Sequence, residues 1–163
     1  MICICSWISI PMAVPFTMQT FAVFCSLELL GGKRGTLAVC VYVLLGAAGL
    51  PVFSGFTGGL GRLLGSTGGY ILGFIVSGLV YSAGERLCGK KAAVRIISMI
   101  LGLVACYAFG TAWFMHVYAK NTGPIALGTA LTWCVLPFIL PDLIKISLAF
   151  LISSRIARAV KLR

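Results

Sequence analysis

The stretch IISMILGLVACYAFGTAWFMHVY (96–118) decides the fold of this chain, because it holds about 23 residues without a formal charge. A helix of that length extends about 34 Å and the hydrocarbon core of a bilayer is about 30 Å thick, so we expect this segment to cross a membrane. Of the 163 residues, 60% are hydrophobic and 10% are charged, and the mean hydropathy is +1.09. A soluble globular domain carries about 25% charged residues, so the composition excludes one, and it excludes a disordered chain as well.

Further apolar segments lie on both sides of this span. Prolines, glycines and charged residues separate them, and we predict helical segments at 1–10, 16–30, 36–50, 68–83, 125–136 and 141–159. Residues 1–10 would extend only about 15 Å as a helix, so they are predicted to form part of a span. Eight glycines between positions 55 and 73 predict a structured loop over 53–67, because each glycine costs a helix interior about 1 kcal/mol.

The predicted fold class is therefore all-α, a polytopic membrane protein with six helical elements of which the first is truncated, and the 125–136 segment belongs to the connection between the last two. Residues 1–163 form a single transmembrane domain in this reading, and no room remains for a soluble domain.

The positive charges predict how the elements are oriented. If the chain crosses the bilayer at each element, one side receives ten of the 13 basic residues: Lys33, Arg34, Arg86, Lys90, Lys91, Arg95, Arg155, Arg158, Lys161 and Arg163. Cytoplasmic loops collect Lys and Arg, so both chain ends are predicted to be cytoplasmic. Basic residues placed between apolar segments report orientation rather than phosphate binding, so the net charge of +10 does not predict a nucleic-acid partner. The glycine-rich loop, the Pro11–Pro15 loop and the 120–141 connection then share the outer face, which suggests a site there.

The chain has three acidic residues, Glu28, Glu85 and Asp142. Glu85 adjoins Arg86 in a predicted cytoplasmic loop and is interpreted as a solvated or paired surface charge. Glu28 lies near the inner end of its span and is expected to reach toward water by snorkelling. Asp142 differs from both, because it lies in an apolar segment on the outer side.

Asp142 and Lys145 form a D-x-x-K sequence directly after Pro141, where the last helix is predicted to begin. Residues three apart on a helix share one face. In one interpretation Asp142 only caps the helix and Lys145 neutralises it. In the other, this intramembrane charge pair marks a polar ligand, because such charges are costly unless they serve a function.

Two further segments are expected to border the same place. Residues 14–20 offer the hydroxyl of Thr17 and the amide of Gln19 at the mouth of a span. A second segment exposes backbone amides where a helix begins, at Thr67, Gly68, Gly69 and Tyr70. An ordinary loop with a helix cap is the competing interpretation for each. A flat apolar wall could come from Phe53, Phe56, Tyr70 and Trp133.

No motif for catalysis, metal binding or ATP hydrolysis occurs. The sequence has no GxxxxGK[ST] loop, no HExxH and no Ser or Cys beside a His. The seven cysteines contain no CxxC pair, and His116 has no Cys or carboxylate at ligand spacing. We therefore expect no enzyme of a known type, no metal and no cofactor, and energy for uphill transport would come from another subunit.

Three segments together resemble the BioY family, the biotin-specific substrate-binding (S) components of energy-coupling-factor (ECF) vitamin transporters. They are IPMAVPFTMQTFAVF (10–24), LLGAAGLPVFSGFTGGLGRLLGSTGGYILGF (44–74) and LPFILPDLIKISLAFL (136–151). The resemblance runs from about Ser6 to the C-terminus. It implies biotin uptake by a six-helix protein of the bacterial inner (plasma) membrane with an outward-facing pocket.

The resemblance also implies roles for particular residues and partners. Asp142 would bind the ureido group of biotin, Lys145 would line or balance the site, and the 15–19 and 67–70 segments would help to enclose the ligand. A transmembrane coupling subunit and two ATP-binding-cassette ATPases would drive reorientation of the S component in the lipid bilayer.

The N-terminus departs from the family pattern. Family members usually begin further upstream of the segment that matches Ser6, with a complete first helix whose small-residue face docks on the coupling subunit. We therefore expect either a start upstream of Met1 or a truncated copy. Two alternatives stay open: an S component for a different small vitamin, and a non-transporting membrane scaffold in which D-x-x-K only caps a helix.

Overall fold

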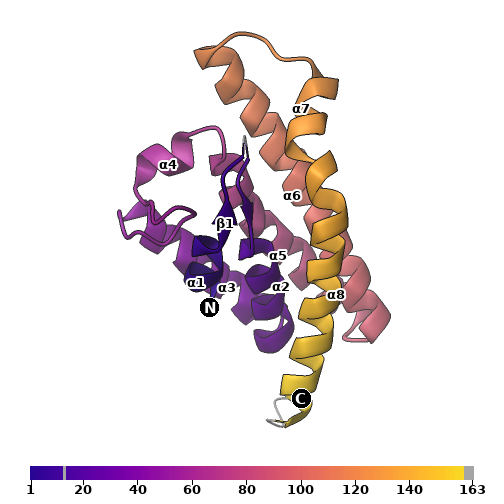
Figure 1. Cartoon of the computed structure of the whole chain (residues 1–163). Coiled ribbons are helices and arrows are strands. Elements are labelled where there is room, and N and C mark those ends of the chain that lie inside the picture. Colours follow the sequence, from indigo (N-terminus) through magenta and orange to yellow (C-terminus); the bar gives the residue numbers. More distant parts are fainter. Residues whose placement is uncertain (13, 160–163) are drawn as a thin grey trace.

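The computed structural model describes residues 1–12 and 14–159, and it is a bundle of helices with one short β-hairpin (Figure 1). In this part of the chain the elements are α1 (Ile2–Trp7), β1 (Ser9–Ile10), β2 (Phe16–Thr17), α2 (Gln19–Leu30), α3 (Gly32–Ala47), α4 (Leu60–Leu64), α5 (Gly68–Cys88), α6 (Ala92–Asn121), α7 (Leu127–Cys134) and α8 (Leu136–Ala159). The two strands pair antiparallel, with Ser9 opposite Thr17 and Ile10 opposite Phe16.

The long helices carry the fold. Helices α5 and α6, together with residues Leu136–Ile156 of α8, are long and apolar enough to cross a membrane, and α2 is a shorter apolar helix. Helices α5 and α6 pack against each other as neighbours in the chain, while α2 packs between α3 and α8. Fully buried side chains at their contacts include Phe24, Leu27, Tyr81 and Met99. The prediction of an all-α membrane protein is confirmed.

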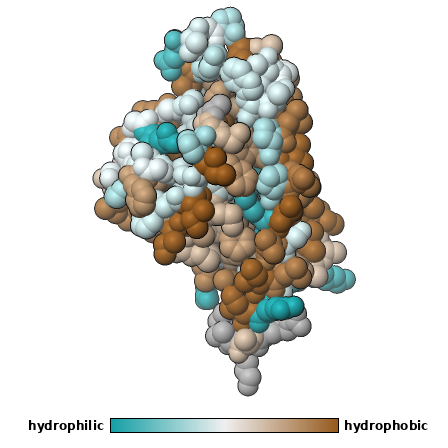
Figure 2. Space-filling view, viewed as in Figure 1, coloured by the Kyte–Doolittle hydropathy of each residue, from teal (hydrophilic) through white to brown (hydrophobic). Residues whose placement is uncertain are grey.

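The two ends of the bundle differ in character. We call one the hairpin end, which carries the tip of the β-hairpin, α4 and the turn between α6 and α7. We call the other the basic end, where the α2–α3 junction, the α5–α6 turn and the C-terminal turns of α8 lie (Figure 1). Figure 2 shows pale and teal residues gathered over the hairpin end, and brown, hydrophobic residues below them.

Six of the ten basic residues predicted to share one side lie at the basic end: Lys33, Arg34, Arg86, Lys90, Lys91 and Arg155. Of the others, Arg95 is buried beside them, and Lys161, Arg163 and the side chain of Arg158 lie outside the described residues.

Several predicted boundaries are wrong by one or two helical turns. Helix α3 begins at Gly32 rather than at residue 36, and α5 continues to Cys88 rather than to residue 83. Residues 1–10 are helical only to Trp7, since Ser9 and Ile10 belong to the hairpin. The predicted 53–67 loop contains the five-residue helix α4. At α3 and α5 a glycine or a charged residue was read as a helix end although the helix continues through it.

The start of α8 corrects the interpretation of Asp142. The last helix was predicted to begin at Pro141, but it begins at Leu136 and passes through Pro141. Pro137 lies in its first turn, where a backbone N–H has no helical partner anyway, so this proline does not end the segment. Asp142 therefore lies more than one turn inside α8, and the interpretation of Asp142 as a helix cap is wrong.

The predictions for the other two acidic residues are also wrong. Glu28 does not reach water: it is 1% exposed, and its Oε2 lies 2.6 Å from Nη1 of Arg95. The hydroxyl of Tyr81 donates to the other oxygen of Glu28 at 2.6 Å. Glu85 is not a solvated loop residue, because it lies in α5 and its Oε2 accepts the backbone N–H of Gly32 at 2.6 Å. These contacts tie α2, α3, α5 and α6 together at the basic end.

Candidate functional site

A cavity of about 70 Å³ opens between the β-hairpin, α2, α4, α5, α6 and α8 in the half of the bundle nearer the hairpin end. Its volume is several times what one water molecule needs. The lining combines an apolar majority with a few polar groups, as small-molecule sites do. The lining residues are Val14, Pro15, Thr17, Gln19, Thr20, Ser54, Arg62, Thr67, Tyr70, Ile71, Phe74, Leu103, Cys106, Tyr107, Cys134, Phe138, Asp142 and Lys145.

A buried charge pair forms the polar centre of this cavity. Nζ of Lys145 lies 2.9 Å from Oδ1 of Asp142, and the two side chains are each 5% exposed. The hydroxyl of Tyr107 on α6 donates to the other oxygen, Oδ2, at 2.6 Å. Each carboxylate oxygen therefore accepts one hydrogen bond from the protein. Because a carboxylate can accept about four, Asp142 keeps acceptor capacity for a ligand.

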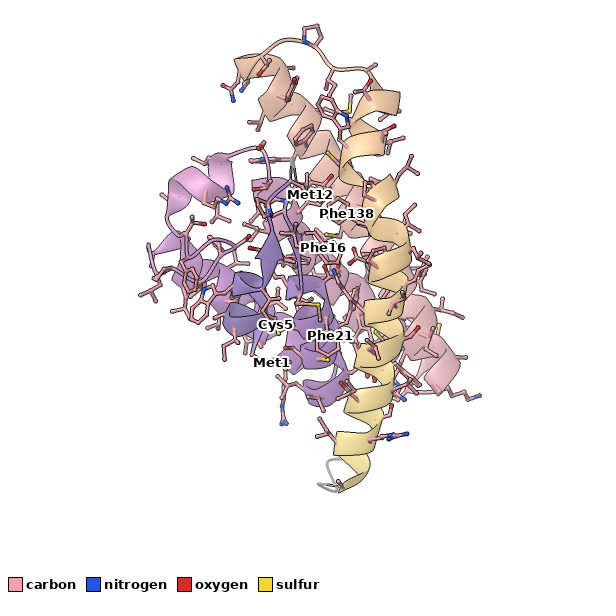
Figure 3. The ribbon with its side chains drawn as sticks, viewed as in Figure 1. Met1, Cys5, Met12, Phe16, Phe21 and Phe138 are labelled. Carbon is pink, nitrogen blue, oxygen red and sulfur yellow. The ribbon has the colours of Figure 1, made fainter. Side chains whose placement is uncertain are left out.

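The ammonium group of Lys145 contacts three neighbouring groups of the protein. Besides Asp142, its ammonium donates to the backbone carbonyl oxygen of Thr17 at 2.7 Å, and it lies 4.0 Å from the centroid of the Phe16 ring. The Phe16 ring in turn stacks on Phe138 of α8 at 6.1 Å between centroids. Figure 3 shows Phe16 and Phe138 close together where β2 passes α8. Lys145 therefore holds the hairpin against α8 while it balances the charge of Asp142.

Thr17 and Gln19 line the cavity, but some of their hydrogen-bonding groups already bind other groups of the protein. The Thr17 hydroxyl accepts the backbone N–H of Gln19 at 3.3 Å. The side-chain amide of Gln19 donates to the hydroxyl of Tyr42 at 2.8 Å, and that hydroxyl donates to the carbonyl of Val52 at 3.1 Å. This chain of hydrogen bonds fixes the start of α2 against the loop that follows α3.

The predicted 67–70 segment divides into two pairs. Thr67 and Tyr70 line the cavity, and the Tyr70 hydroxyl lies 2.9 Å from Oγ1 of Thr111. Gly68 and Gly69 are not among the lining residues. A Cβ at Gly69 would lie 2.3 Å from Cβ of Trp113 on α6, so this glycine allows α5 and α6 to approach closely.

The structure thus brings six of the eight predicted site residues to one cavity, and that they bind a ligand stays a prediction. Of the predicted aromatic wall, only Tyr70 lines the cavity. Phe53 is fully buried elsewhere, and Phe56 and Trp133 are 64% and 43% exposed. The apolar wall instead comes from Ile71, Phe74, Leu103 and Phe138.

Tyr107, Arg62 and Ser54 are polar lining residues that the sequence analysis did not single out. Tyr107 follows Leu103 by one helical turn, and both line the cavity, so helical periodicity indicates a shared face. No local signal distinguishes that face from the lipid-facing ones of α6. Arg62 lies in the 53–67 loop that was predicted to face outward, and the sequence analysis gave it no role. Within the described residues, no group of three or more His, Cys, Asp or Glu side chains could hold a metal ion.

A bundle with three helices long and apolar enough to cross a membrane, and with a buried charge pair at a cavity, defines a helical membrane protein. The chain belongs to the BioY family, whose family model matches residues 1–162. It is 43% identical over 156 residues to the "Biotin transporter BioY" of Thermotoga maritima, covering 94% of this chain and 87% of the relative. It is 39% identical over 143 residues to the "Probable biotin transporter BioY" of Pyrococcus horikoshii, covering 88% and 80%. The resemblance to this family is confirmed.

A solved structure shares the fold. The chain superposes with a TM-score of 0.84 and 27% identity on a crystal structure of the S component for biotin from an ECF-type ABC transporter. The match covers 96% of this chain and 85% of that one. The S-component fold predicted from the sequence is therefore confirmed, and the described part of the chain forms it with eight helices of different lengths.

Proposed function

We propose that this protein is the biotin-binding S component of an ECF-type transporter and that it captures biotin for uptake across the membrane. Family membership, the names of the relatives and the S-component fold support this proposal. The single observation on which the proposal depends is the environment of the Asp142 carboxylate. Its carboxylate is buried, balanced by Lys145 and oriented by Tyr107, and it still has acceptor capacity on the cavity side.

The chemistry of biotin fits this arrangement. The ureido ring is neutral and carries N–H donors, and a hydrogen bond from such a donor to a charged carboxylate is stronger than one to a neutral acceptor. The fused rings are largely apolar and match the wall formed by Ile71, Phe74, Leu103 and Phe138. Asp142 would therefore recognise the ureido ring of biotin, while the apolar side chains would exclude water from around the fused rings.

The direction of transport follows from the charges. The basic end carries Lys33, Arg34, Arg86, Lys90 and Lys91, and this excess of positive charge supports a cytoplasmic position for it in a bacterial inner membrane. The cavity then faces outward, and the C-terminus is cytoplasmic.

The protein acts as a carrier and not as an enzyme. Since the sequence has no GxxxxGK[ST] loop, a transmembrane coupling subunit and two ATP-binding-cassette ATPases would supply the energy.

Direct binding measurements on the purified protein test this function. We expect wild type to bind radiolabelled biotin in detergent or nanodiscs, and excess thiamine or riboflavin not to compete. Asp142→Asn keeps the shape of the side chain and removes its charge. Because a hydrogen bond to a charged group contributes about 1.5–3 kcal/mol, we expect this variant to lose at least about tenfold in affinity.

Glu85→Gln is the matched control, because it also neutralises a carboxylate but lies at the basic end. A glutamine oxygen can still accept the N–H of Gly32, so this variant should bind biotin as wild type does. Equal affinities of wild type and Asp142→Asn would refute the proposed role of Asp142. Competition by thiamine or riboflavin would assign the cavity to a different vitamin.

A further inference from the structure

A second hollow, larger than the cavity that holds Asp142, lies between α6, α7 and α8 and has a volume of about 570 Å³. We call it the α6–α8 groove. Leu103 and Tyr107 of α6 line both the cavity and this groove, so these two side chains stand between the two spaces. Asp142 and Lys145 line only the cavity. The groove is therefore a separate feature of the fold, and the proposed function does not use it.

The shape of the groove follows from the sizes of its side chains. Ala108 and Ala112, which lie one helical turn apart on α6, line it and are exposed. Leu127 and Leu131 of α7 and Leu143 of α8 line it as well, and these bulky side chains are also exposed. Figure 1 shows α7 between the ends of α6 and α8. Short side chains flanked by long ones leave a hollow, and a bulky rim favours a narrow, flexible occupant over a helix, which is about 10 Å across.

The groove opens toward the hydrocarbon of the bilayer. Its α6 and α8 residues belong to Ala92–Asn121 and Leu136–Ile156, two segments that are long and apolar enough to cross a membrane. Among the described residues, no charged side chain lines the groove. A ligand that needs a counter-ion would therefore find none in it, whereas acyl chains surround both helices along their length.

The two hydroxyl groups of the lining are already bonded on the cavity side. The Tyr107 hydroxyl donates to Asp142 at 2.6 Å, and the Thr111 hydroxyl lies 2.9 Å from that of Tyr70. Both Asp142 and Tyr70 line the cavity rather than the groove. A transmembrane helix docked in the groove would lack the polar contacts that often hold helices together in lipid. A hydrocarbon chain needs no such contacts.

An apolar hollow of this size is unfavourable if it stays unfilled. The side chains around a void lose dispersion contacts, and the loss of stability grows with the volume of the void. A flexible chain of methylene groups can restore these contacts along the whole groove. The position of the groove, its lining and its volume therefore all favour the same occupant.

We propose that the α6–α8 groove binds one acyl chain of a membrane phospholipid. The chain lies against Ala108 and Ala112 and covers the membrane side of Leu103 and Tyr107. It supports the wall of the cavity from outside without entering the cavity. Because the groove holds this chain on three sides, the lipid stays bound when the surrounding bilayer is removed. The proposal does not depend on which ligand the cavity binds.

Photocrosslinking from the acyl chain tests this site directly. The full chain is placed in nanodiscs of phosphatidylcholine that contain a small fraction of phosphatidylcholine with a diazirine in its acyl chain. One sample is irradiated in the nanodiscs and a second after transfer into lipid-free detergent, and mass spectrometry locates the crosslinks. We expect label on all lipid-facing helices in the nanodiscs. After transfer, only crosslinks to groove residues should remain, because lipids on the open surface exchange for detergent.

Ala108→Trp fills the groove with a large side chain and should lose the crosslinks that persist in detergent. Leu79→Trp is the matched control, because Leu79 is exposed on α5 and does not line the groove. It adds the same ring to another membrane-facing surface and should keep those crosslinks. Both variants should bind biotin as wild type does, which also shows that they are folded.

The wild-type map is decisive even without the variants. Crosslinks that vanish everywhere after transfer, or that persist equally on α5 and in the groove, would overturn the proposal. A groove without label already in the nanodiscs would overturn it as well, because protein would then cover this surface. Loss of biotin binding in folded Ala108→Trp protein would show that the groove belongs to the ligand site, and that result would also refute a separate lipid site.

Discussion

The Asp142 carboxylate is held inside the bundle by one neighbour three residues away and another 35 residues away. A buried carboxylate without partners would cost several kcal/mol, and here Lys145 and Tyr107 each supply a donor. The D-x-x-K spacing correctly predicted that Asp142 and Lys145 share one helix face. The sequence could not indicate Tyr107, because it lies 35 residues earlier in an apolar helix and only the packing of α6 near α8 brings it to Oδ2.

Tyr107 is predicted to hold Asp142 in place rather than to bind the ligand itself. Tyr107→Phe keeps the ring and removes the donor to Oδ2. We expect the ligand-free variant to lose about 1.5–3 kcal/mol of stability, because a hydrogen bond to a charged group is lost. Unfolding in detergent and biotin binding can both be measured, and affinity should fall less than in Asp142→Asn. A variant that loses binding as completely as Asp142→Asn would place Tyr107 in direct contact with biotin.

The apolar segments of the helices could be predicted from the sequence, but the polar residues at their ends could not be assigned correctly. The 96–118 stretch predicted α6 correctly, because an uncharged run of this length has few other structures available. Arg95 was read as a loop residue because it is charged, yet it lies in the first turn of α6 and is 6% exposed. Its partner Glu28 lies 67 residues away, and such a pairing has no local signature in the sequence.

The Glu28–Arg95 pair is predicted to stabilise the basic end without contributing to the binding site. Glu28→Gln would leave the buried Arg95 uncompensated, although Tyr81 and the Phe150 ring, 4.9 Å away, remain beside the cluster. We expect a loss of about 3–5 kcal/mol in the free energy of unfolding. The exposed Lys90→Gln serves as control and should unfold as wild type does. Folded Glu28→Gln protein should bind biotin with unchanged affinity, and a variant as stable as wild type would contradict the prediction.

Across the molecule, the cavity lies nearer one end of the bundle and six basic residues gather at the other. This segregation could be predicted from the order of apolar and charged segments alone, since neighbouring spans must alternate in direction. How the outer segments meet could not be predicted. The hairpin has strands of two residues, and its place depends on contacts such as Lys145 to Thr17, which join residues 128 positions apart. Six of the eight predicted site residues meet because helices α2, α5 and α8 and the hairpin converge there.

The orientation of the molecule in the membrane can be tested through Cys88, which is exposed at the basic end near the α5–α6 turn. If the basic end is cytoplasmic, a membrane-impermeant maleimide should not reach Cys88 in intact cells and should label it after permeabilisation. The Cys88→Ser variant shows which part of the labelling comes from Cys88 and which part comes from the other cysteines. In the Cys88→Ser background, Lys120→Cys places a thiol at the hairpin end, and intact cells should then be labelled. Labelling of Cys88 in intact cells, with Lys120→Cys protected, would reverse the orientation. The cavity would then open toward the cytoplasm, a geometry from which external biotin could not be captured.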